Sequence, residues 1–341
     1  MTKGSDLEST ARALVASGKG ILAADESSST IAKRLSSIDV ESTEDNRRAY
    51  RNMLFTTEGL QEFISGVILF DETIRQASDD GVAFPKLLAD KGMVPGIKVD
   101  KGAKALALFP GEKVTEGLDG LRERLEEYAS MGARFTKWRA VIAIGEGLPT
   151  DYCIAANVHA LARFAALSQE GGLVPIVEPE VLMDGGHSIE RCYEVTARVL
   201  GSLFDELAAA RVELPETLLK TNMVLSGTEA SPRAGVTEVA DATVRCMKEV
   251  VPSEVPGIVF LSGGQGDEEA TAHLDAMNRI GPHPWELSFS YGRALQAPAL
   301  KAWRGQSDNV AAGQRALYVR AKLNGAARSG SYTPDMEGRA A

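Results

Sequence analysis

The stretch "DYCIAANVHALARFAALSQEGGLVPIVEPE", residues 151–180, contains one complete helix-to-strand unit of this chain. Residues 151–170 read as a helix that ends at two glycines, and residues 173–180 read as an apolar strand. A strand this apolar that directly follows a helix is typical of a parallel sheet covered by helices. The unit therefore predicts an α/β fold.

The same alternation recurs along the chain and predicts eight strands. They are expected at residues 20–25, 66–70, 94–100, 133–139, 173–180, 217–224, 257–264 and 285–293. Eight such units, on the roughly 250-residue scale of this fold plus extensions, favour a closed (β/α)₈ TIM barrel over a doubly wound sheet. A dinucleotide-binding fold is disfavoured because no GxGxxG motif follows the first strand. We predict a single barrel domain over residues 1–341, with an N-terminal helix and a polar tail at about 329–341 that is expected to be mobile.

Composition, charge and cysteine content limit the kinds of partner and the cellular location that this chain can be expected to have. The chain is 44% hydrophobic and 25% charged, which is ordinary for a soluble globular protein. Its formal net charge of −10 disfavours nucleic acid and anionic membranes as partners. Three widely spaced cysteines suggest no disulfide framework, and the polar N-terminus has no secretory signal. We therefore expect a cytoplasmic protein without a membrane segment.

Charged and hydroxyl residues collect where the expected strands end, which is where this fold places its catalytic groups. They are Asp25, Lys98, Asp100, Lys137, Arg139, Glu178, Glu180, Lys220, Ser262, Ser290 and Arg293. Residues two apart on a strand point the same way, so we expect Lys137 to share a face with Arg139, and Glu178 with Glu180. The pattern predicts a ring of cations and carboxylates at one end of the barrel. A purely structural ion network remains the alternative.

Lys220 lies within the apolar run "TLLKTNMVL", residues 217–225. An ammonium buried there without a partner would be costly and would tend to lose its proton. If Lys220 faces the ring of charges and a substrate, these groups are its partners. If it lies on a solvated edge strand, it is an ordinary surface lysine. An uncharged lysine at this position would be a nucleophile.

Two segments predict a phosphate site. "FLSGGQG", residues 260–266, brings a strand into a glycine-rich turn whose N–H groups could approach an anion. "SFSYGR", residues 288–293, follows as the eighth strand, and the loops after strands seven and eight form the recurrent phosphate site of this barrel. Arg293 could hold a phosphate bidentately. Lys98, Lys33 and Arg34 could serve a second phosphate at the opposite rim, although a solvated helix face also explains the last two.

No metal site is expected. The four histidines are scattered, and none lies at an expected strand end. Carboxylates could hold magnesium, but the neighbouring lysines would compete for them. We therefore expect neither a metal nor a cofactor.

The sequence as a whole resembles the class I (Schiff-base) fructose-1,6-bisphosphate aldolase family. The matching stretches run from about residue 20 to beyond residue 300, in the family's order. They are "GILAADES", "IAKRL", "GVILF", "GIKVDKG", "KWR", "VPIVEPE", "LLK" with "NMV", "FLSGGQ", "FSYGRALQ" and "ALKAW". The resemblance implies reversible cleavage of a phosphorylated sugar without a metal, in glycolysis and gluconeogenesis. It also implies a cytoplasmic homo-oligomer, often a tetramer.

The resemblance assigns roles by motif. Lys220 resembles the Schiff-base lysine, and Glu178 resembles the general acid/base, with Glu180 beside it. Lys137, Arg139 and Asp25 resemble the other catalytic residues. The positions that resemble the binding site for the phosphate on C1 are Ser262, Gly263, Gly264, Ser290, Gly292 and Arg293. The positions that resemble the lining at the substrate's other end are Thr30, Lys33, Arg34 and Lys98.

Three positions depart from the family pattern. Thr221 replaces the proline that commonly follows the Schiff-base lysine, and Ser29 stands where glycine is usual. Many family members end in a tyrosine that assists enamine protonation, whereas this chain ends in "MEGRAA" and its nearest tyrosine is Tyr332. We expect another group or water to reprotonate the enamine, and an altered preference between bisphosphate and monophosphate.

Three other functions stay open. A different Schiff-base barrel enzyme, such as a transaldolase, would share the lysine but need one phosphate site. A non-catalytic scaffold could keep the fold, and a metal-dependent aldolase would be sensitive to chelators.

Overall fold

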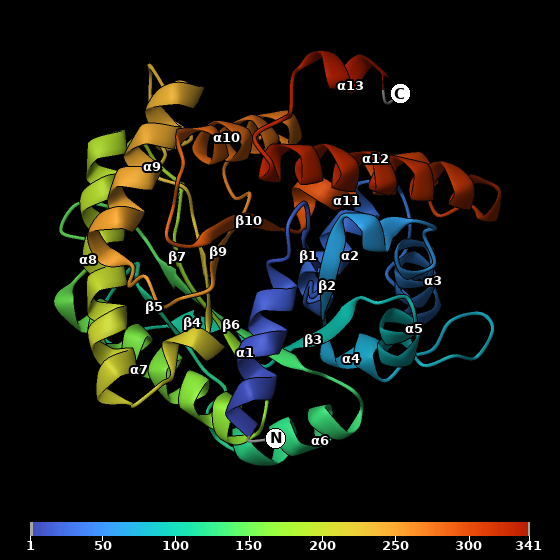
Figure 1. The fold of residues 1–341 in the computed structure, drawn as a ribbon, viewed down its shortest axis with the longest axis horizontal. Helices are drawn as coiled ribbons and strands as arrows, with labels where there is room; N and C mark the ends of the chain where they lie inside the picture. The colour runs from blue at the N-terminus through green and yellow to red at the C-terminus, as the bar shows by residue number, and fades with distance from the viewer. Residues whose placement is uncertain (1–2, 340–341) are drawn as a thin grey trace.

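The computed structural model describes residues 3–339, and eight parallel strands within them form a closed barrel (Figure 1). Around the barrel the strand order is β1, β10, β9, β8, β7, β6, β3, β2. The strands are β1 (Gly20–Ala23), β2 (Ile64–Leu69), β3 (Val94–Lys98), β6 (Phe135–Ile142), β7 (Val174–Val181), β8 (Leu218–Thr221), β9 (Gly257–Phe260) and β10 (Glu286–Tyr291). Each predicted strand segment overlaps one of them, although β2, β6 and β7 extend beyond the predicted bounds. The predicted TIM barrel is confirmed.

Helices surround the strands in Figure 1 and precede or follow them in the predicted alternation. Their bounds are α1 (Lys3–Leu14), α2 (Ser28–Ser36), α3 (Glu44–Phe55), α4 (Asp71–Ile74), α5 (Phe84–Asp90), α6 (Leu121–Ser130), α7 (Asp151–Glu170), α8 (Ile189–Ala209), α9 (Val236–Val250), α10 (Asp267–Ile280), α11 (Arg293–Trp303), α12 (Val310–Arg328) and α13 (Asp335–Arg339). Short 3₁₀ turns lie at Leu60–Glu62, Leu214–Glu216 and Ser307–Asn309. The hydroxyls of Thr150 and Ser188 begin α7 and α8 by accepting hydrogen bonds from backbone N–H groups in the first turn.

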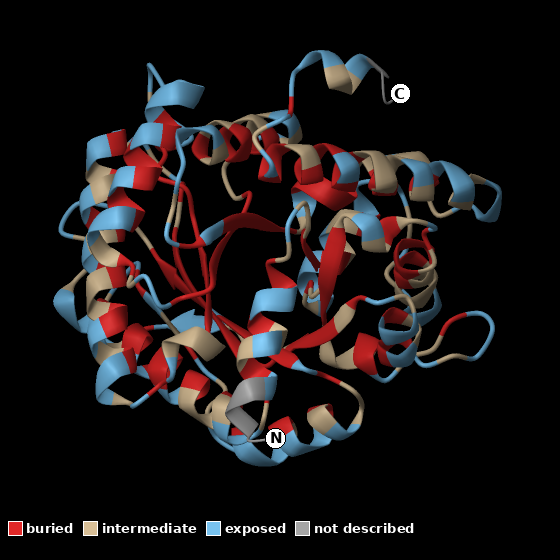
Figure 2. Ribbon diagram, in the orientation of Figure 1, coloured by how far each residue is buried: buried red, intermediate tan, exposed pale blue. Residues whose placement is uncertain are grey.

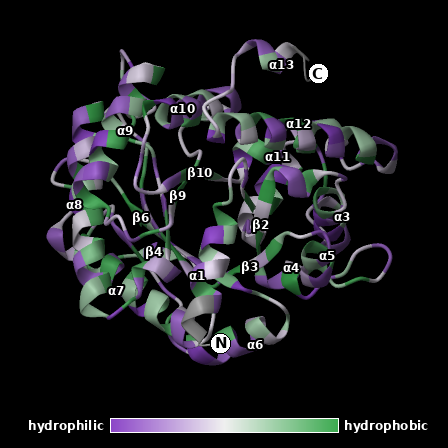
Figure 3. Ribbon diagram, viewed as in Figure 1, coloured by the Kyte–Doolittle hydropathy of each residue, from purple (hydrophilic) through white to green (hydrophobic). Residues whose placement is uncertain are grey.

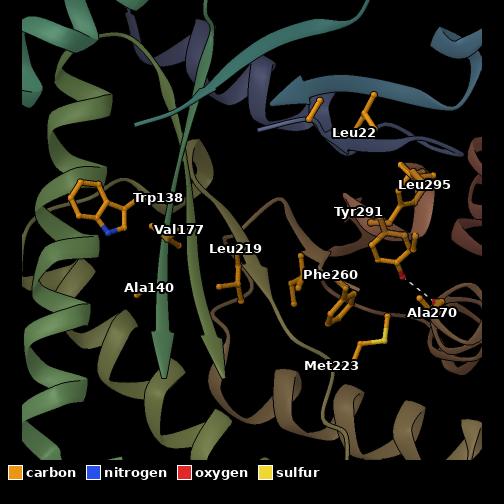
Figure 4. Packing of buried hydrophobic residues seen from close by; sticks show 14 of the residues in the cluster. Leu22, Trp138, Ala140, Val177, Leu219, Met223, Phe260, Ala270, Tyr291 and Leu295 are labelled. Atoms are coloured by element: carbon orange, nitrogen blue, oxygen red, sulfur yellow. Dashed lines mark hydrogen bonds between the residues drawn. The ribbon is translucent and has the colours of Figure 1, made fainter. Parts of the chain in front are cut away.

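The layer between sheet and helices forms the larger part of the hydrophobic core. Trp138, Val177, Leu219, Phe260 and Tyr291 come from five consecutive strands of the barrel and point outward into this layer (Figure 4). Figure 2 shows the strands as buried, whereas the helices expose their outer faces. Because both faces of the sheet are covered, its strands read as continuous apolar runs.

The inside of the barrel is apolar at the end where the strands begin. Phe135, Val174 and Leu218 lie there together with Leu14 of α1, in a cluster separate from the outer layer. The Ser65 hydroxyl donates to the Leu14 carbonyl and ties α1 to β2. The N-terminal helix therefore closes this end of the barrel, and polar inward residues are left to the opposite end.

An unpredicted hairpin interrupts the alternation between β3 and β6. Its strands, β4 (Ala103–Ala105) and β5 (Lys113–Thr115), pair in antiparallel register. The Lys101 N–H donates to the Glu116 carbonyl at 2.8 Å and extends the pairing. Residues 103–105 are exposed and lack an apolar run, so periodicity could not reveal them.

The C-terminal segment is held more firmly than its composition suggested. Tyr332 is buried, and its hydroxyl donates to Glu337 at 3.0 Å. Glu337 in turn accepts two hydrogen bonds of 2.7 Å from the buried Arg320 on α12. These contacts anchor α13, although the expected mobility of residues 329–341 stays a prediction, and residues 340–341 lie outside the described range.

Within residues 3–339, no helix combines the length and apolarity needed to cross a membrane. Polar and apolar residues alternate along the helices instead (Figure 3).

Gly96 on β3 makes room for a ring inside the barrel. A Cβ at this position would overlap the ring of Phe135, which is fully buried. We expect Gly96→Ala to destabilise the protein by about 1–3 kcal/mol, as overpacking does in other cores. Thermal and urea unfolding measure the change.

Gly201→Ala is the matched control. Gly201 lies inside α8, and no described atom comes within 4 Å of an added Cβ. Alanine there should stabilise by about 0.5–1 kcal/mol through helix propensity. Equal effects of the two substitutions would contradict the packing argument.

Candidate active site

A cavity of about 1100 Å³ opens at the end of the barrel where the strands finish. Its walls carry fourteen of the sixteen residues that the sequence assigned to catalysis or binding. They are Asp25, Thr30, Arg34, Lys98, Lys137, Arg139, Glu178, Glu180, Lys220, Ser262, Gly263, Ser290, Gly292 and Arg293. Residues at or just after the ends of all eight barrel strands, together with α2, α4, α6 and the β4–β5 hairpin, meet there.

The pleat of the strands turns these groups inward. On β6, Phe135 packs in the apolar end of the barrel, and Lys137 and Arg139 follow it on the same face. On β7, Ile176 precedes Glu178 and Glu180 in the same way. The predicted sharing of faces is confirmed, since all four charged side chains line the cavity.

A cluster of four buried charges lies at the bottom of the cavity. Lys137 Nζ is 2.6 Å from Asp25 Oδ2 and 3.0 Å from Glu178 Oε2. Glu178 Oε1 is 3.1 Å from Lys220 Nζ, so this carboxylate joins two lysines. The side chains of Glu178, Lys137 and Lys220 are each at most 5% exposed. Opposite charges at these distances offset the cost of removing each one from water.

Mutual attraction keeps Asp25, Glu178 and Lys137 ionised. Burial would raise the pKa of Asp25, but the ammonium groups of Lys137 and Lys220 outweigh it and hold this pKa well below its usual range. Burial opposes the same cations at Glu178, and its pKa is also lowered. For Lys137, the carboxylates of Asp25 and Glu178 outweigh burial and raise the pKa above its ordinary value.

Two further ion pairs stand above the cluster. Lys98 Nζ lies 2.6 Å from Asp100 Oδ1, and the other Asp100 oxygen accepts a hydrogen bond from the Arg139 backbone N–H at 3.2 Å. The Arg139 side chain pairs with Glu180 and is 43% exposed. Burial opposes this pair, yet Glu180 raises the pKa of Arg139. Arg139 is thus a cation available to a ligand in the cavity mouth.

The two segments expected to bind phosphate lie side by side across β9 and β10. Arg293 Nη2 donates to the backbone carbonyls of Gln265 at 2.6 Å and Ser262 at 3.3 Å, which joins the glycine-rich turn to α11. The Ser290 hydroxyl is buried and has no protein hydrogen-bond partner within the described chain. Two glycines, two serines and an arginine therefore line one part of the cavity, a combination suited to an anion.

Residues 6–341 match the family model of class-I fructose-bisphosphate aldolase. The chain belongs to the class-I fructose-bisphosphate aldolase family. "Probable fructose-bisphosphate aldolase class 1" of Xanthomonas campestris is 61% identical over 327 residues, which cover 96% of this chain and 98% of that protein. "Fructose-bisphosphate aldolase 6, cytosolic" of Arabidopsis thaliana is 53% identical over 94% of this chain and 89% of the relative. A solved aldolase of Plasmodium falciparum superposes with a TM-score of 0.96 at 49% identity, covering 97% of this chain and 96% of that one. The protein is accordingly a lyase of the aldolase type.

Two residues assigned to substrate binding do not line the cavity of this aldolase. Lys33 is exposed on α2, about 100° around the helix from Arg34, whereas Thr30 and Arg34 are four residues apart and share the cavity face. Gly264 has a φ of +76° and shapes the turn below Ser262 and Gly263. Arg34 itself lies beside the phosphate loop, because a Cβ at Gly292 would be 3.5 Å from Arg34 Nη2. The assignment of Arg34 to the substrate's other end stays a prediction.

Sequence reasoning missed several residues of the aldolase cavity. Glu26, Asp71, Arg75, Arg124 and Tyr128 line it as well. Glu26 and Asp71 directly follow the ends of β1 and β2, which was an available signal. Arg124 and Tyr128 come from the middle of α6, where one-dimensional periodicity gives no hint that a side chain reaches the site.

The three departures from the family pattern fall in different surroundings. Thr221 is fully buried behind Lys220, and Ser29 lines the cavity with its hydroxyl 3.2 Å from that of Ser27. Tyr332 does not line the cavity, and burial with the Glu337 contact raises the pKa of its hydroxyl.

The buried cluster generates a pH-dependent prediction. In the wild-type aldolase the pKa values of Asp25 and Glu178 are lowered, so their stabilising contribution is present above pH ~4 and is lost as the pH falls. Lys137→Met leaves both carboxylates with less compensation. We expect the free energy of unfolding at pH 7 to fall by about 3–5 kcal/mol. The deficit should shrink toward pH 4, because protonation removes the uncompensated charges.

Lys86→Met removes the cation of an exposed ion pair with Asp90 and serves as the control. It should change stability by less than about 0.5 kcal/mol at any pH. Urea unfolding at several pH values measures both variants. A Lys137→Met deficit that is independent of pH would sink the electrostatic explanation.

Proposed function

We propose that this aldolase reversibly cleaves D-fructose 1,6-bisphosphate to dihydroxyacetone phosphate and D-glyceraldehyde 3-phosphate through a Schiff base on Lys220. The observation that carries the proposal is the bridging carboxylate of Glu178, 3.1 Å from Lys220 and 3.0 Å from Lys137. One acid beside two amines can accept and return protons at the atom where an imine forms. The steps belong to glycolysis in one direction and gluconeogenesis in the other.

The first half of the reaction builds an electron sink. The Lys220 ammonium first passes a proton to the Glu178 carboxylate 3.1 Å away. The uncharged amine then attacks the C2 carbonyl of the open-chain sugar, and a tetrahedral carbinolamine forms. Glu178 delivers a proton to the departing hydroxyl, so water leaves and a protonated imine remains. Lys137, which is held charged by its two carboxylates, stabilises oxygen atoms that gain negative charge during these steps.

The second half breaks the C3–C4 bond. A carboxylate, Asp25 or Glu178, removes the proton of the C4 hydroxyl, and the electrons of the C3–C4 bond pass into the iminium. Glyceraldehyde 3-phosphate leaves and an enamine stays on Lys220. Protonation at C3 and hydrolysis then free dihydroxyacetone phosphate and the amine.

Two anion sites orient the bisphosphate across the cavity. Ser262, Gly263, Ser290, Gly292 and Arg293 form the site for the phosphate on C1. The cations Lys98 and Arg139, together with Thr30, are candidates for the other phosphate. Fixing both ends holds the reacting bond at Lys220 and supplies the effective concentration of an intramolecular reaction.

Borohydride trapping tests the covalent step. Incubation with dihydroxyacetone phosphate and borohydride should reduce the imine and label the peptide that contains Lys220, as peptide mass mapping detects. Lys137, in the same cluster, should stay unlabelled in the same digest and serves as an internal control. Lys220→Arg keeps a positive charge beside Glu178 but should abolish both labelling and cleavage. Full-speed cleavage without a label at position 220 contradicts the mechanism.

We also propose that Tyr332 does not protonate the enamine, and that another group or water does. Its burial and its hydrogen bond to Glu337 support this view. Tyr332→Phe should change the rate of C3 proton exchange of dihydroxyacetone phosphate by less than about twofold, measured by NMR in heavy water. The control is Tyr152→Phe, since Tyr152 is 56% exposed and outside the cavity lining. A selective loss of exchange in Tyr332→Phe would restore the role of a C-terminal tyrosine.

The preference for the bisphosphate over fructose 1-phosphate is expected to differ from the preference of family members that end in tyrosine.

We further propose a cytoplasmic homo-oligomer, with four copies as the resemblance implies. The proposed location is supported by the Arabidopsis relatives, which are named cytosolic. Light scattering of the purified protein measures the number of copies.

A further inference from the structure

A buried carboxylate in the cavity wall joins four elements of the fold. Glu26 follows β1, and its side chain is 4% exposed. It pairs with Arg34 of α2, and it lies 2.6 Å from Arg51 Nη2 of α3. It also accepts a hydrogen bond of 2.8 Å from the Gln296 side chain of α11.

Gln296 ties this carboxylate to the end of β1. Its Nε2 also donates to the Ala23 carbonyl at 2.6 Å, and its Oε1 accepts from the Tyr50 hydroxyl at 2.9 Å. All three side chains are buried, and Tyr50 stacks on Trp303. The position of Glu26 is therefore set in part by packing and hydrogen bonds with residues that do not line the cavity.

Arg34 is the member of this group that reaches the cavity. Its guanidinium uses Nη1 for Glu26, and its Nη2 lies against Gly292 in the loop expected to hold a phosphate. Among residues 3–339, Glu26 is the single side-chain partner of this guanidinium. Nε and Nη2 are left to donate to a ligand.

Arg51 has a different position, because it does not line the cavity and is only 3% exposed. Glu26 is its one carboxylate partner in the described chain. One carboxylate thus faces two guanidinium groups, and the cluster keeps one net positive charge. Without Arg51 the charges of Glu26 and Arg34 would cancel, and the cavity wall would lose its attraction for an anion.

We infer that Arg51 is a positioning residue for phosphate binding, because it neutralises Glu26 and so lets Glu26 orient the Arg34 guanidinium without cancelling its charge. The inference rests on the proposed function, since the anion is a phosphate of the sugar substrate. Arg51 acts through Glu26 and Arg34 and touches no reacting atom.

The test compares Arg51→Met, Glu26→Gln and the double variant with the wild-type protein. Arg51→Met should raise the KM for fructose 1,6-bisphosphate about 10-fold and leave kcat within about twofold, because the amine and carboxylates of the reaction are unchanged. The double variant restores one net positive charge, so its KM should return to within about threefold of wild type. A merely structural role would make the double variant no better than Arg51→Met.

Two further variants separate charge from shape. Arg51→Lys keeps the charge and should keep KM within about threefold. Arg47→Met removes another arginine of α3, whose ion pair with Glu72 lies outside the cavity lining. It should lower stability while KM stays unchanged. A KM for Arg51→Lys as high as for Arg51→Met, or the same KM rise in Arg47→Met, overturns the inference.

Circular dichroism and the Tm of each variant show whether the variant is folded. If Arg51→Met does not fold, the double variant is compared with Glu26→Gln, in which no carboxylate remains to be neutralised. Removing Arg51 in that background should change KM less than about threefold, and a larger rise overturns the inference.

Borohydride trapping at saturating dihydroxyacetone phosphate distinguishes a failure of the Arg51 inference from a failure of the proposed function. Label at Lys220 in all folded variants, with an unchanged KM for Arg51→Met, refutes only the role of Arg51. Absence of label at Lys220 in the wild-type protein refutes the Schiff-base mechanism itself.

Discussion

The architecture of this aldolase depends on keeping four charges in a nearly dry space. Asp25, Lys137, Glu178 and Lys220 lie within 2.6–3.1 Å of their neighbours at the bottom of the cavity. Each would be costly to bury alone, and pairing makes their burial tolerable. The same arrangement keeps Lys137 charged and the carboxylates ionised, which is the electrostatic setting that the proposed imine chemistry needs. Removing one member changes every other, so the cluster behaves as one unit.

The barrel provides this setting by dividing its interior in two. Phe135, Val174, Leu218 and the N-terminal helix fill the end where the strands begin. Two residues further along β6, β7 and β8 the inward side chains become Lys137, Ile176 and Lys220, and charged groups follow. Hydrocarbon below excludes water, and the loops above admit the substrate. The outer layer of apolar contacts between strands and helices holds both halves in register.

Around the charged cluster, a second set of residues sets the potential of the walls. Arg293 joins the glycine-rich turn to α11 through backbone carbonyls, and the Gln265 side-chain oxygen accepts a hydrogen bond of 2.7 Å from Nδ1 of the buried His273. Burial lowers the pKa of His273 to about 4, so this imidazole is neutral near pH 7. In the inference drawn above, Glu26 and Arg51 together set the charge at Arg34, and Arg51 does so without lining the cavity.

The sequence by itself determined the barrel, the approximate positions of its strands and which charged side chains at the strand ends point inward, because the period-two pleat and the apolar runs are local properties. The sequence also identified Glu178 and Lys220 as candidate site residues, because both are charged residues within apolar strand segments. Only the tertiary structure decided which charges pair, that Arg34 lies beside Gly292 while Lys33 faces solvent, and that α6 and the β4–β5 hairpin complete the cavity. These facts arise where segments far apart in the chain meet, and a one-dimensional pattern carries no information on such distances.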